Sequence, residues 1–226
     1  GRKAHDRFGR IDTWVNNAGV AIYGRLDETN EKDDRQLFDI NFWGVVYGSL
    51  TALPYLKANG GALINVGSEV SEAVFPHLGM YCATKHAVKG FTDALRIEIE
   101  ELDQAPISIT LIEPTAVDTP FPQHARNYLS QEARLPTPRI TPEEVAEAIL
   151  GAAENPIRTK RVGVMATLNT ATAKLMPGVA KTVAARRVGE LEYDQSPQSP
   201  SGSLFKASEE ATEVAGTTRP AGAIED

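Results

Sequence analysis

Residues 68–85 read SEVSEAVFPHLGMYCATK and place a serine, a tyrosine and a lysine within one short stretch. Tyr81 and Lys85 are four residues apart, so a helix would put both side chains on one face, about one turn from each other. A free phenol has a pKa of about 10, and a fixed ammonium group nearby lowers that pKa because it favours the phenolate. The pair therefore indicates a tyrosine that exchanges a proton during a reaction.

Ser68 directly follows the apolar run ALINVG, which is typical of a buried strand. A strand end that faces the start of a helix would bring the Ser68 hydroxyl and the Tyr81 hydroxyl toward one oxygen atom of a bound molecule.

Ser68, the Tyr-x-x-x-Lys pattern after it, Asn41 before it and the tetrapeptide NNAG at 16–19 together resemble the short-chain dehydrogenase/reductase family. Tyr-x-x-x-Lys alone occurs by chance in many helices, whereas the four elements in this order are specific. The resemblance implies an α/β fold with a Rossmann-like doubly wound parallel sheet. It also implies an oxidoreductase that uses NAD or NADP, acts on a small alcohol or ketone, forms a homodimer or homotetramer, and needs no metal.

The resemblance further assigns roles to individual residues. Tyr81 would be the general acid or base, Lys85 would lower the Tyr81 pKa and bind the nicotinamide ribose, and Ser68 would hydrogen-bond the reacting oxygen. Asn41 would hold a water that links Lys85 to solvent, or would instead cap or kink a helix junction. The residues expected to contact the cofactor are Asn16, Ala18, Gly19, Tyr81, Lys85, Pro114, Val117 and Thr119. The residues expected to contact the substrate are Ser68, Val70, Phe75 and Tyr81, with Val74 on the same loop.

The start of the chain departs from the family pattern. The run IDTWVNNAG predicts a buried strand and a turn, which the family places fourth in its sheet. No Gly-rich turn that would seat a pyrophosphate precedes it, so the chain resembles an N-terminally truncated member without its first strands and helices. We expect its first strand to form an open sheet edge, and the choice between NAD and NADP to depend on residues that this chain does not contain.

Composition limits the class of protein. The 226 residues are 42% hydrophobic and 23% charged, which is ordinary for a globular chain, and the net charge of −7 argues against binding to nucleic acid. Cys82 is the single cysteine and is expected to be a small buried residue, so no internal disulfide forms. No apolar run is long enough to span a membrane and no signal peptide opens the chain, which predicts a cytoplasmic protein.

Several further elements are expected along the chain. Helices are predicted for 1–10, 31–38, 42–57 and 81–102, and strands for 62–66, 107–112 and 161–166. Thr115 stands where the family has a glycine, which predicts a more restricted turn. Residues 120–140 are expected to form a lid over the pocket, and Thr141, Pro142 and Glu144 to start a helix with a capping box. His77 is expected to be a surface loop residue.

The C-terminal third divides into two expected regions beyond a main domain at 1–170. Residues 171–190 predict a basic amphipathic helix, because 156–189 contain seven Lys or Arg and no acidic residue. That helix is expected to dock on the core or on a partner subunit, with contact to a membrane surface by 172–188 as the less favoured alternative. Residues 191–226 are expected to be disordered or loosely packed.

Two other functions stay open at this point. The chain could be a non-catalytic fragment that pairs with full-length subunits, as the missing pyrophosphate turn suggests. It could also be a lyase or epimerase that uses the same Tyr81 and Lys85. Detection of a hydride transfer to or from any alcohol or ketone would separate these functions from the oxidoreductase.

Overall fold

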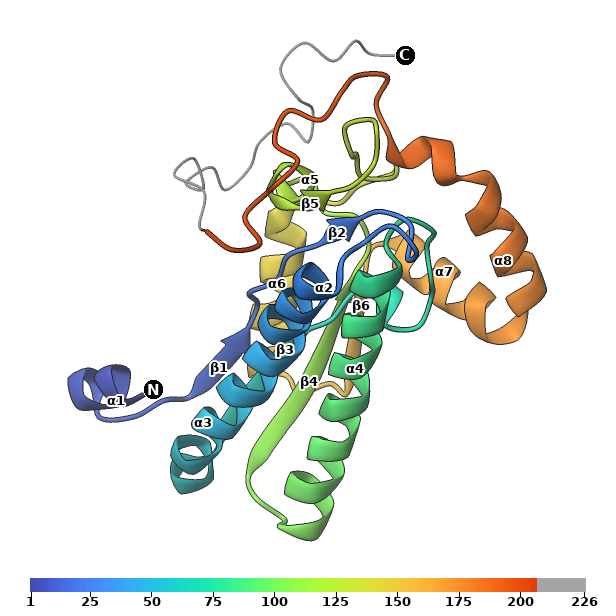
Figure 1. The fold of residues 1–226 in the computed structure, drawn as a ribbon. Coiled ribbons are helices and arrows are strands. Elements are labelled where there is room, and N and C mark those ends of the chain that lie inside the picture. The colour runs from blue at the N-terminus through green and yellow to red at the C-terminus, as the bar shows by residue number, and fades with distance from the viewer. Residues whose placement is uncertain (207–226) are drawn as a thin grey trace.

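The computed structural model describes residues 1–206 and centres on one parallel sheet (Figure 1). Its strands are β1 (Thr13–Asn16), β3 (Gly61–Val66), β4 (Ile107–Pro114) and β6 (Thr159–Val162), which lie in the order β1-β3-β4-β6. All three strand pairs are parallel, so every carboxyl end meets the same edge of the sheet. The expected doubly wound α/β architecture is therefore confirmed for this part of the chain.

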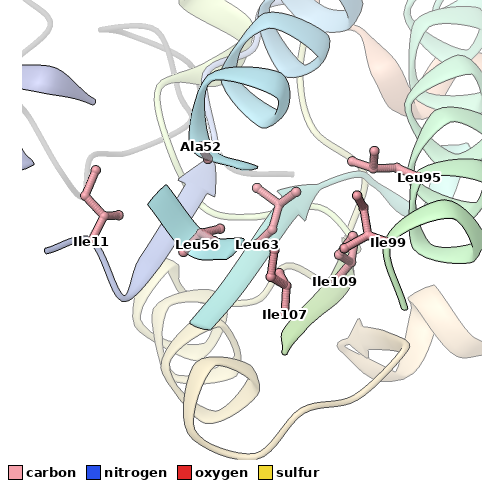
Figure 2. Close-up of a cluster of buried hydrophobic side chains, with 8 residues drawn as sticks. All are labelled: Ile11, Ala52, Leu56, Leu63, Leu95, Ile99, Ile107 and Ile109. Carbon is pink, nitrogen blue, oxygen red and sulfur yellow. The ribbon is translucent and has the colours of Figure 1, made fainter. Parts of the chain in front are cut away.

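The two central strands are continuous apolar runs, because both of their faces are covered. Helices α3 (Gly44–Asn59) and α4 (Gly79–Arg96) cover one face, and α6 (Pro142–Glu154) covers the other (Figure 1). Figure 2 shows the core on the first face. Its buried side chains are Ile11, Ala52, Leu56, Leu63, Leu95, Ile99, Ile107 and Ile109.

Strand β1 differs from the expected buried strand. It is the edge of the described sheet, and its residues alternate between exposed and half-buried, with Val15 39% exposed. The expectation of an open edge at this strand is met. The helix before it, α1 (Arg2–Phe8), lies within the helix predicted at 1–10, ends at Gly9 in the left-handed conformation and buries none of its residues.

Side chains cap the starts of two helices, one of which the sequence predicts. The Asn30 side chain accepts a hydrogen bond from the Asp33 N–H at the start of α2 (Glu31–Phe38). At α6, Thr141 and Glu144 form the predicted reciprocal capping box. These caps fix where the polypeptide enters the helices beside the sheet edge.

Two helices are longer and less regular than predicted. A π-helical turn at Asp39–Trp43 joins α2 directly to α3, so Asn41 lies inside a helix junction. A second π-helical turn at Ile97–Leu102 extends α4. The helices predicted separately at 31–38 and 42–57 are therefore the two ends of one continuous helical segment, 31–59.

The expected last strand at 161–166 is wrong in its bounds. Strand β6 ends at Val162, and helix α7 (Val164–Leu175) begins after Gly163, which takes a φ of 91°. The predicted basic helix at 171–190 is also divided, because α7 ends at Leu175 and α8 (Pro177–Arg186) starts at the proline. Helix α8 has no buried residue, so it does not dock on the core in the expected way.

The segment after α8 differs from the expected loose tail. Leu191 and Leu204 are 2% and 1% exposed, and a short helical turn at Val188–Leu191 leads into this segment. Residues 191–206 therefore pack on the core, while 207–226 lie outside the described residues. Within residues 1–206, no helix has the length and apolar character needed to cross a membrane.

Short elements cover the carboxyl edge of the sheet. Strand β2 (Ile22–Tyr23) pairs with β5 (Arg126–Asn127), which follows helix α5 (Phe121–His124). Ala21, Ile22 and Tyr23 are almost fully buried under residues 121–135. The lid expected at 120–140 thus lies over the site and is tied to the core by a strand pair.

Candidate active site

A cavity of about 530 Å³ opens at the carboxyl ends of β1, β3 and β4. Ligands of open parallel sheets bind at this edge. The cavity is lined on its strand side by Asn17, Gly19, Gly67, Ser68, Lys85, Pro114, Thr115, Val117 and Thr119, among others. Its other side is lined mainly by apolar side chains.

Ser68 and Tyr81 meet in this cavity, as the sequence predicts. Ser68 is held just beyond β3, because its backbone N–H donates to Ser71 Oγ at 3.1 Å and its own Oγ accepts from the Val70 N–H at 3.3 Å. The Ser68 side chain also lies close enough to the Tyr81 phenol to lower its pKa. Two hydroxyl groups from a strand end and a helix start therefore converge on one point of the cavity.

Lys85 lies one helical turn beyond Tyr81 and is 4% exposed. Its Nζ donates to the Val66 carbonyl oxygen at 2.9 Å and lies 5.7 Å from the centroid of the Tyr81 ring. Burial lowers the pKa of Lys85 to about 8, because desolvation disfavours the ammonium form. An ammonium has three N–H donors, and among residues 1–206 only the Val66 carbonyl accepts one from Lys85.

The Tyr81 pKa differs from the prediction. Burial raises the pKa of the Tyr81 phenol, the Ser68 side chain opposes this rise, and the nearby Cys82 and Glu69 add to it. The net shift of the Tyr81 pKa is upward, against the lowering that the sequence predicts. Tyr81 is therefore a protonated phenol at neutral pH, which is the form that donates a proton.

Asn41 does not line the cavity but connects two segments beside it through hydrogen bonds. Its amide accepts from the Val20 N–H and donates to the Val20 carbonyl, both at 2.9 Å, and donates to Thr84 Oγ1 at 3.1 Å. A side chain added at Gly19 would lie 3.5 Å from Asn41 Oδ1 and 3.7 Å from Lys85 Nζ. Asn41 thus connects the residue after the NNAG turn to α4 from within a helix junction, and its predicted part in holding a water stays a prediction.

The NNAG residues divide between two environments. Asn16 donates to Asn65 Oδ1 at 2.8 Å and to Ser49 Oγ at 3.0 Å, and it accepts from Trp14 Nε1, so its side chain is engaged between β3 and α3. Neither Asn16 nor Ala18 lines the cavity, whereas Gly19 does. The sequence prediction missed Asn17, which lines the cavity because successive residues of an extended chain point to opposite sides.

The loop after β4 lines the cavity with all of its predicted residues, Pro114, Val117 and Thr119. Thr119 Oγ1 donates to the Val117 carbonyl at 3.3 Å. The expected restriction at Thr115 does not arise, because its backbone avoids the left-handed region. Thr115 instead contributes its hydroxyl, which donates to Glu69 Oε1 at 3.1 Å.

The far side of the cavity is apolar. Val70 and Phe75 line it as predicted, but Val74 is 63% exposed and points away. The other apolar residues on this side are Leu78, Phe121, Leu135, Pro136, Val145, Ile149 and Leu191. His77 is partly buried rather than on the surface, with Nδ1 3.2 Å from Glu192 Oε1. The predicted burial of Cys82 is confirmed at 2% exposure.

Glu69 is a cavity residue that the sequence prediction missed. It is 5% exposed, and its two carboxylate oxygens accept from Thr115 Oγ1 and, at 2.8 Å, from Asn169 Nδ2 of α7. Burial raises the pKa of this carboxyl, and the two hydrogen bonds oppose that rise. Its position directly after Ser68 was the available signal, but the partner on α7 is visible only in the folded chain.

Comparison with known proteins agrees with this geometry. A family described as short chain dehydrogenase matches residues 2–129. The chain is 39% identical over 196 residues to the uncharacterized oxidoreductase YxnA of Bacillus subtilis, covering 85% of this chain and 55% of YxnA. It is 36% identical over 156 residues to the uncharacterized oxidoreductase SSP1627 of Staphylococcus saprophyticus, covering 68% and 63%. The chain thus spans little more than half of the length of these relatives.

Solved structures show the same architecture. A short chain dehydrogenase from Burkholderia cenocepacia, in complex with NADP, aligns with a TM-score of 0.65 at 26% identity, covering 82% of this chain and 74% of that one. An alcohol dehydrogenase from Thermococcus sibiricus, complexed with 5-hydroxy-NADP, aligns with a TM-score of 0.58 at 29% identity, covering 71% and 65%.

Proposed function

Because this chain belongs to the short-chain dehydrogenase family, we propose that it carries the catalytic and substrate-binding part of an NAD(P)-dependent oxidoreductase that interconverts an alcohol and a ketone. The observation that carries this proposal is the convergence of the Ser68 and Tyr81 hydroxyl groups in one cavity, with the Lys85 ammonium one turn behind.

The residues present fit the nicotinamide part of such a cofactor. Lys85 has N–H donors that no described residue uses, and it faces the same cavity as Asn17 and the loop at 114–119. These residues would hold the nicotinamide and its ribose, and NAD(P)H would supply the hydride. Within the described residues no Gly-rich turn is present for the pyrophosphate, so the proposal assigns this chain no role at that end of the cofactor.

Three side chains have separate roles at the substrate oxygen. The Tyr81 O–H donates its proton to that oxygen in the reducing direction and regains it in the oxidising direction. The Ser68 O–H hydrogen-bonds the same oxygen and stabilises the negative charge that develops on it. Lys85, with a pKa near 8, places a positive charge behind the phenol and stabilises the phenolate that remains after proton transfer.

The test is hydride transfer by Tyr81→Phe. This variant keeps the ring and removes the proton donor, so we expect turnover to fall by about 10²- to 10⁴-fold, measured as absorbance change of NAD(P)H with a panel of apolar ketones. Cofactor affinity, measured by fluorescence titration, should stay within about threefold. Wild-type turnover that survives in Tyr81→Phe would remove Tyr81 from the mechanism. A wild-type protein that binds ketones but transfers no hydride would favour a lyase, epimerase or non-catalytic partner instead.

We also propose that the protein associates with further copies of itself. Trp43, Tyr47 and Leu50 form one exposed stripe along the start of α3, with exposures of 43%, 63% and 51%. Apolar stripes of this kind mark protein contact surfaces. Sedimentation equilibrium would give the number of subunits.

A further inference from the structure

Tyr23 is a second tyrosine in the wall of the active-site cavity. It lies in β2 and is 0% exposed. Its carbonyl oxygen accepts from the Tyr128 N–H at 2.8 Å, and its ring belongs to a buried cluster with Val70, Leu78 and Cys82. Backbone pairing and ring packing therefore fix the position of its hydroxyl.

The Tyr23 hydroxyl is shielded from solvent and has no hydrogen-bond partner among residues 1–206. Tyr128, which directly follows β5, differs from Tyr23 because its hydroxyl has a partner: it donates to Asp33 Oδ2 at 2.8 Å. Burial raises the pKa of Tyr23, and the charge of an ionised Tyr81 would raise it further. Tyr23 is thus a protonated hydrogen-bond donor that is close enough to Tyr81 to sense its charge.

The surroundings offer no acceptor to this donor. Glu69, a buried carboxylate in the cavity wall, accepts from Thr115 and Asn169 and not from Tyr23. The side chains that pack around Tyr23 are mostly aliphatic or aromatic. A buried hydroxyl without an acceptor is unfavourable, and folded proteins retain few of them. Because Tyr23 also lines the cavity, a small shift of the surrounding side chains would let an acceptor atom of a bound molecule reach this hydroxyl.

We propose that the Tyr23 hydroxyl donates a hydrogen bond to a second oxygen atom of the substrate, beside the oxygen that reacts at Ser68 and Tyr81. This inference rests on the proposed function and specifies its substrate class. The substrates are predominantly apolar ketones or alcohols that carry one further hydroxyl, carbonyl or ether oxygen. The apolar wall at Phe75, Phe121 and Leu135 accommodates the hydrocarbon part.

The experiment compares a ketone with analogues that differ by one oxygen. 2-Decalone and two analogues with a hydroxyl group at different positions of the distal ring are titrated by calorimetry into the protein with NAD or NADP, where no reduction occurs. The same three ketones are then assayed for kcat/KM with NADH or NADPH. We expect the wild type to bind and reduce the best hydroxylated analogue about tenfold better than the parent, as one net hydrogen bond allows. In Tyr23→Phe this ratio should fall to about one.

Tyr128→Phe is the matched control, because it removes a partnered phenol hydroxyl outside the cavity. It should keep the wild-type substrate ratio and lower the melting temperature by a few degrees. Tyr23→Phe should leave the melting temperature of the ligand-free protein unchanged or raise it, because it removes a buried group without a partner. A purely structural role for the Tyr23 hydroxyl would lower that temperature.

Three results would overturn the inference. They are an equal binding ratio in wild type and Tyr23→Phe, no preference of the wild type for either hydroxylated analogue, and a loss of melting temperature in Tyr23→Phe as large as in Tyr128→Phe. The last result would mean that a buried water already satisfies the hydroxyl. If no ketone is reduced but the binding ratio still depends on Tyr23, the proposed oxidoreductase function fails and the Tyr23 subsite stands.

Discussion

The two walls of the active-site cavity are built in different ways. The strand-end wall holds most of the polar groups. It is formed by Asn17, Gly19, 67–69, Tyr81, Lys85, 114–117 and Thr119. The cap wall, formed by Phe121, Leu135, Pro136 and Leu191, is apolar. Parallel strands and their following turns fix the first wall, whereas loops from two distant parts of the chain form the second.

Backbone hydrogen bonds hold the cap wall together. Arg134 N–H donates to the Leu191 carbonyl, and Tyr193 N–H donates to the Glu132 carbonyl, each at 2.8 Å. These contacts join the lid to a segment some sixty residues later in the chain. Under the proposed function, proton transfer depends on the sheet edge that the parallel strands fix, while substrate fit depends on the loops of the cap wall.

The largest expected effect comes from removing the positive charge of the strand-end wall. Lys85→Met keeps the length of the side chain and removes the charge, so we expect turnover to fall by at least about 100-fold. Folding should persist because methionine suits this buried site. Steady-state rates of NAD(P)H oxidation provide the measurement.

Lys89→Met is the control for this change. Lys89 lies one turn further along α4, pairs with Asp93 at 2.6 Å and does not line the cavity. Its loss should alter turnover by less than about threefold, because surface ion pairs contribute little. Comparable rates for both variants would show that the buried charge has no part in the reaction.

The next effect tests whether the C-terminal segment is an integral part of the cap. Leu204 is 1% exposed and packs with Ile22 and Leu37. Leu204→Ala should lower the free energy of unfolding by about 2 to 4 kcal/mol, because it leaves a cavity in the core. Urea unfolding of the variant and of Phe205→Ala makes the comparison.

Phe205 is adjacent and 51% exposed, so its replacement should cost less than about 1 kcal/mol. Equal losses in the two variants would mean that residues 191–206 do not contribute to the folded core.

The smallest effect concerns a buried acid beneath the strand-end wall. Glu113 at the end of β4 is 0% exposed, and burial, with the nearby Glu72, raises its pKa to about 7. Its carboxylate lies 3.3 Å from Arg161 Nε, which opposes that rise. The folded state therefore holds a proton between about pH 4.5 and 7 that the unfolded state releases.

Stability should consequently fall as pH rises through that window, by roughly 1 to 3 kcal/mol from this group. Glu113→Gln should flatten the profile of unfolding free energy between pH 5 and 7.5, and exposed Glu147→Gln should retain the wild-type slope. A wild-type profile that rises over this range would contradict the assigned direction.

Local patterns were sufficient for the strand-end wall. Apolar runs predict β3 and β4, the spacing of Tyr81 and Lys85 places them on one helix face, and Thr141 with Glu144 predicts a capping box. Each of these features depends on residues within a few positions of one another. Local rules failed at the Tyr81 pKa, because burial by distant segments determines its shift.

The cap wall could not be predicted from the sequence in the same way. The pairing of β2 with β5 and the contact of Glu69 with Asn169 join residues that are far apart in the chain. Leu191 and Leu204 are buried although they lie in or beside a polar, proline-rich stretch. The composition of residues 191–226 predicted disorder or loose packing, but a few large apolar residues were enough to anchor 191–206.

The sequence by itself indicated individual strands and helices through short-range periodicity, and the family resemblance implied the parallel sheet and the roles of the serine, tyrosine and lysine of the site. The tertiary structure alone decided which asparagine of the NNAG turn faces the cavity, which carboxylate lies beside Ser68, and that Tyr23 holds a hydroxyl without a partner. Those properties arise from burial, and burial depends on every segment that packs around a residue rather than on its neighbours in the chain.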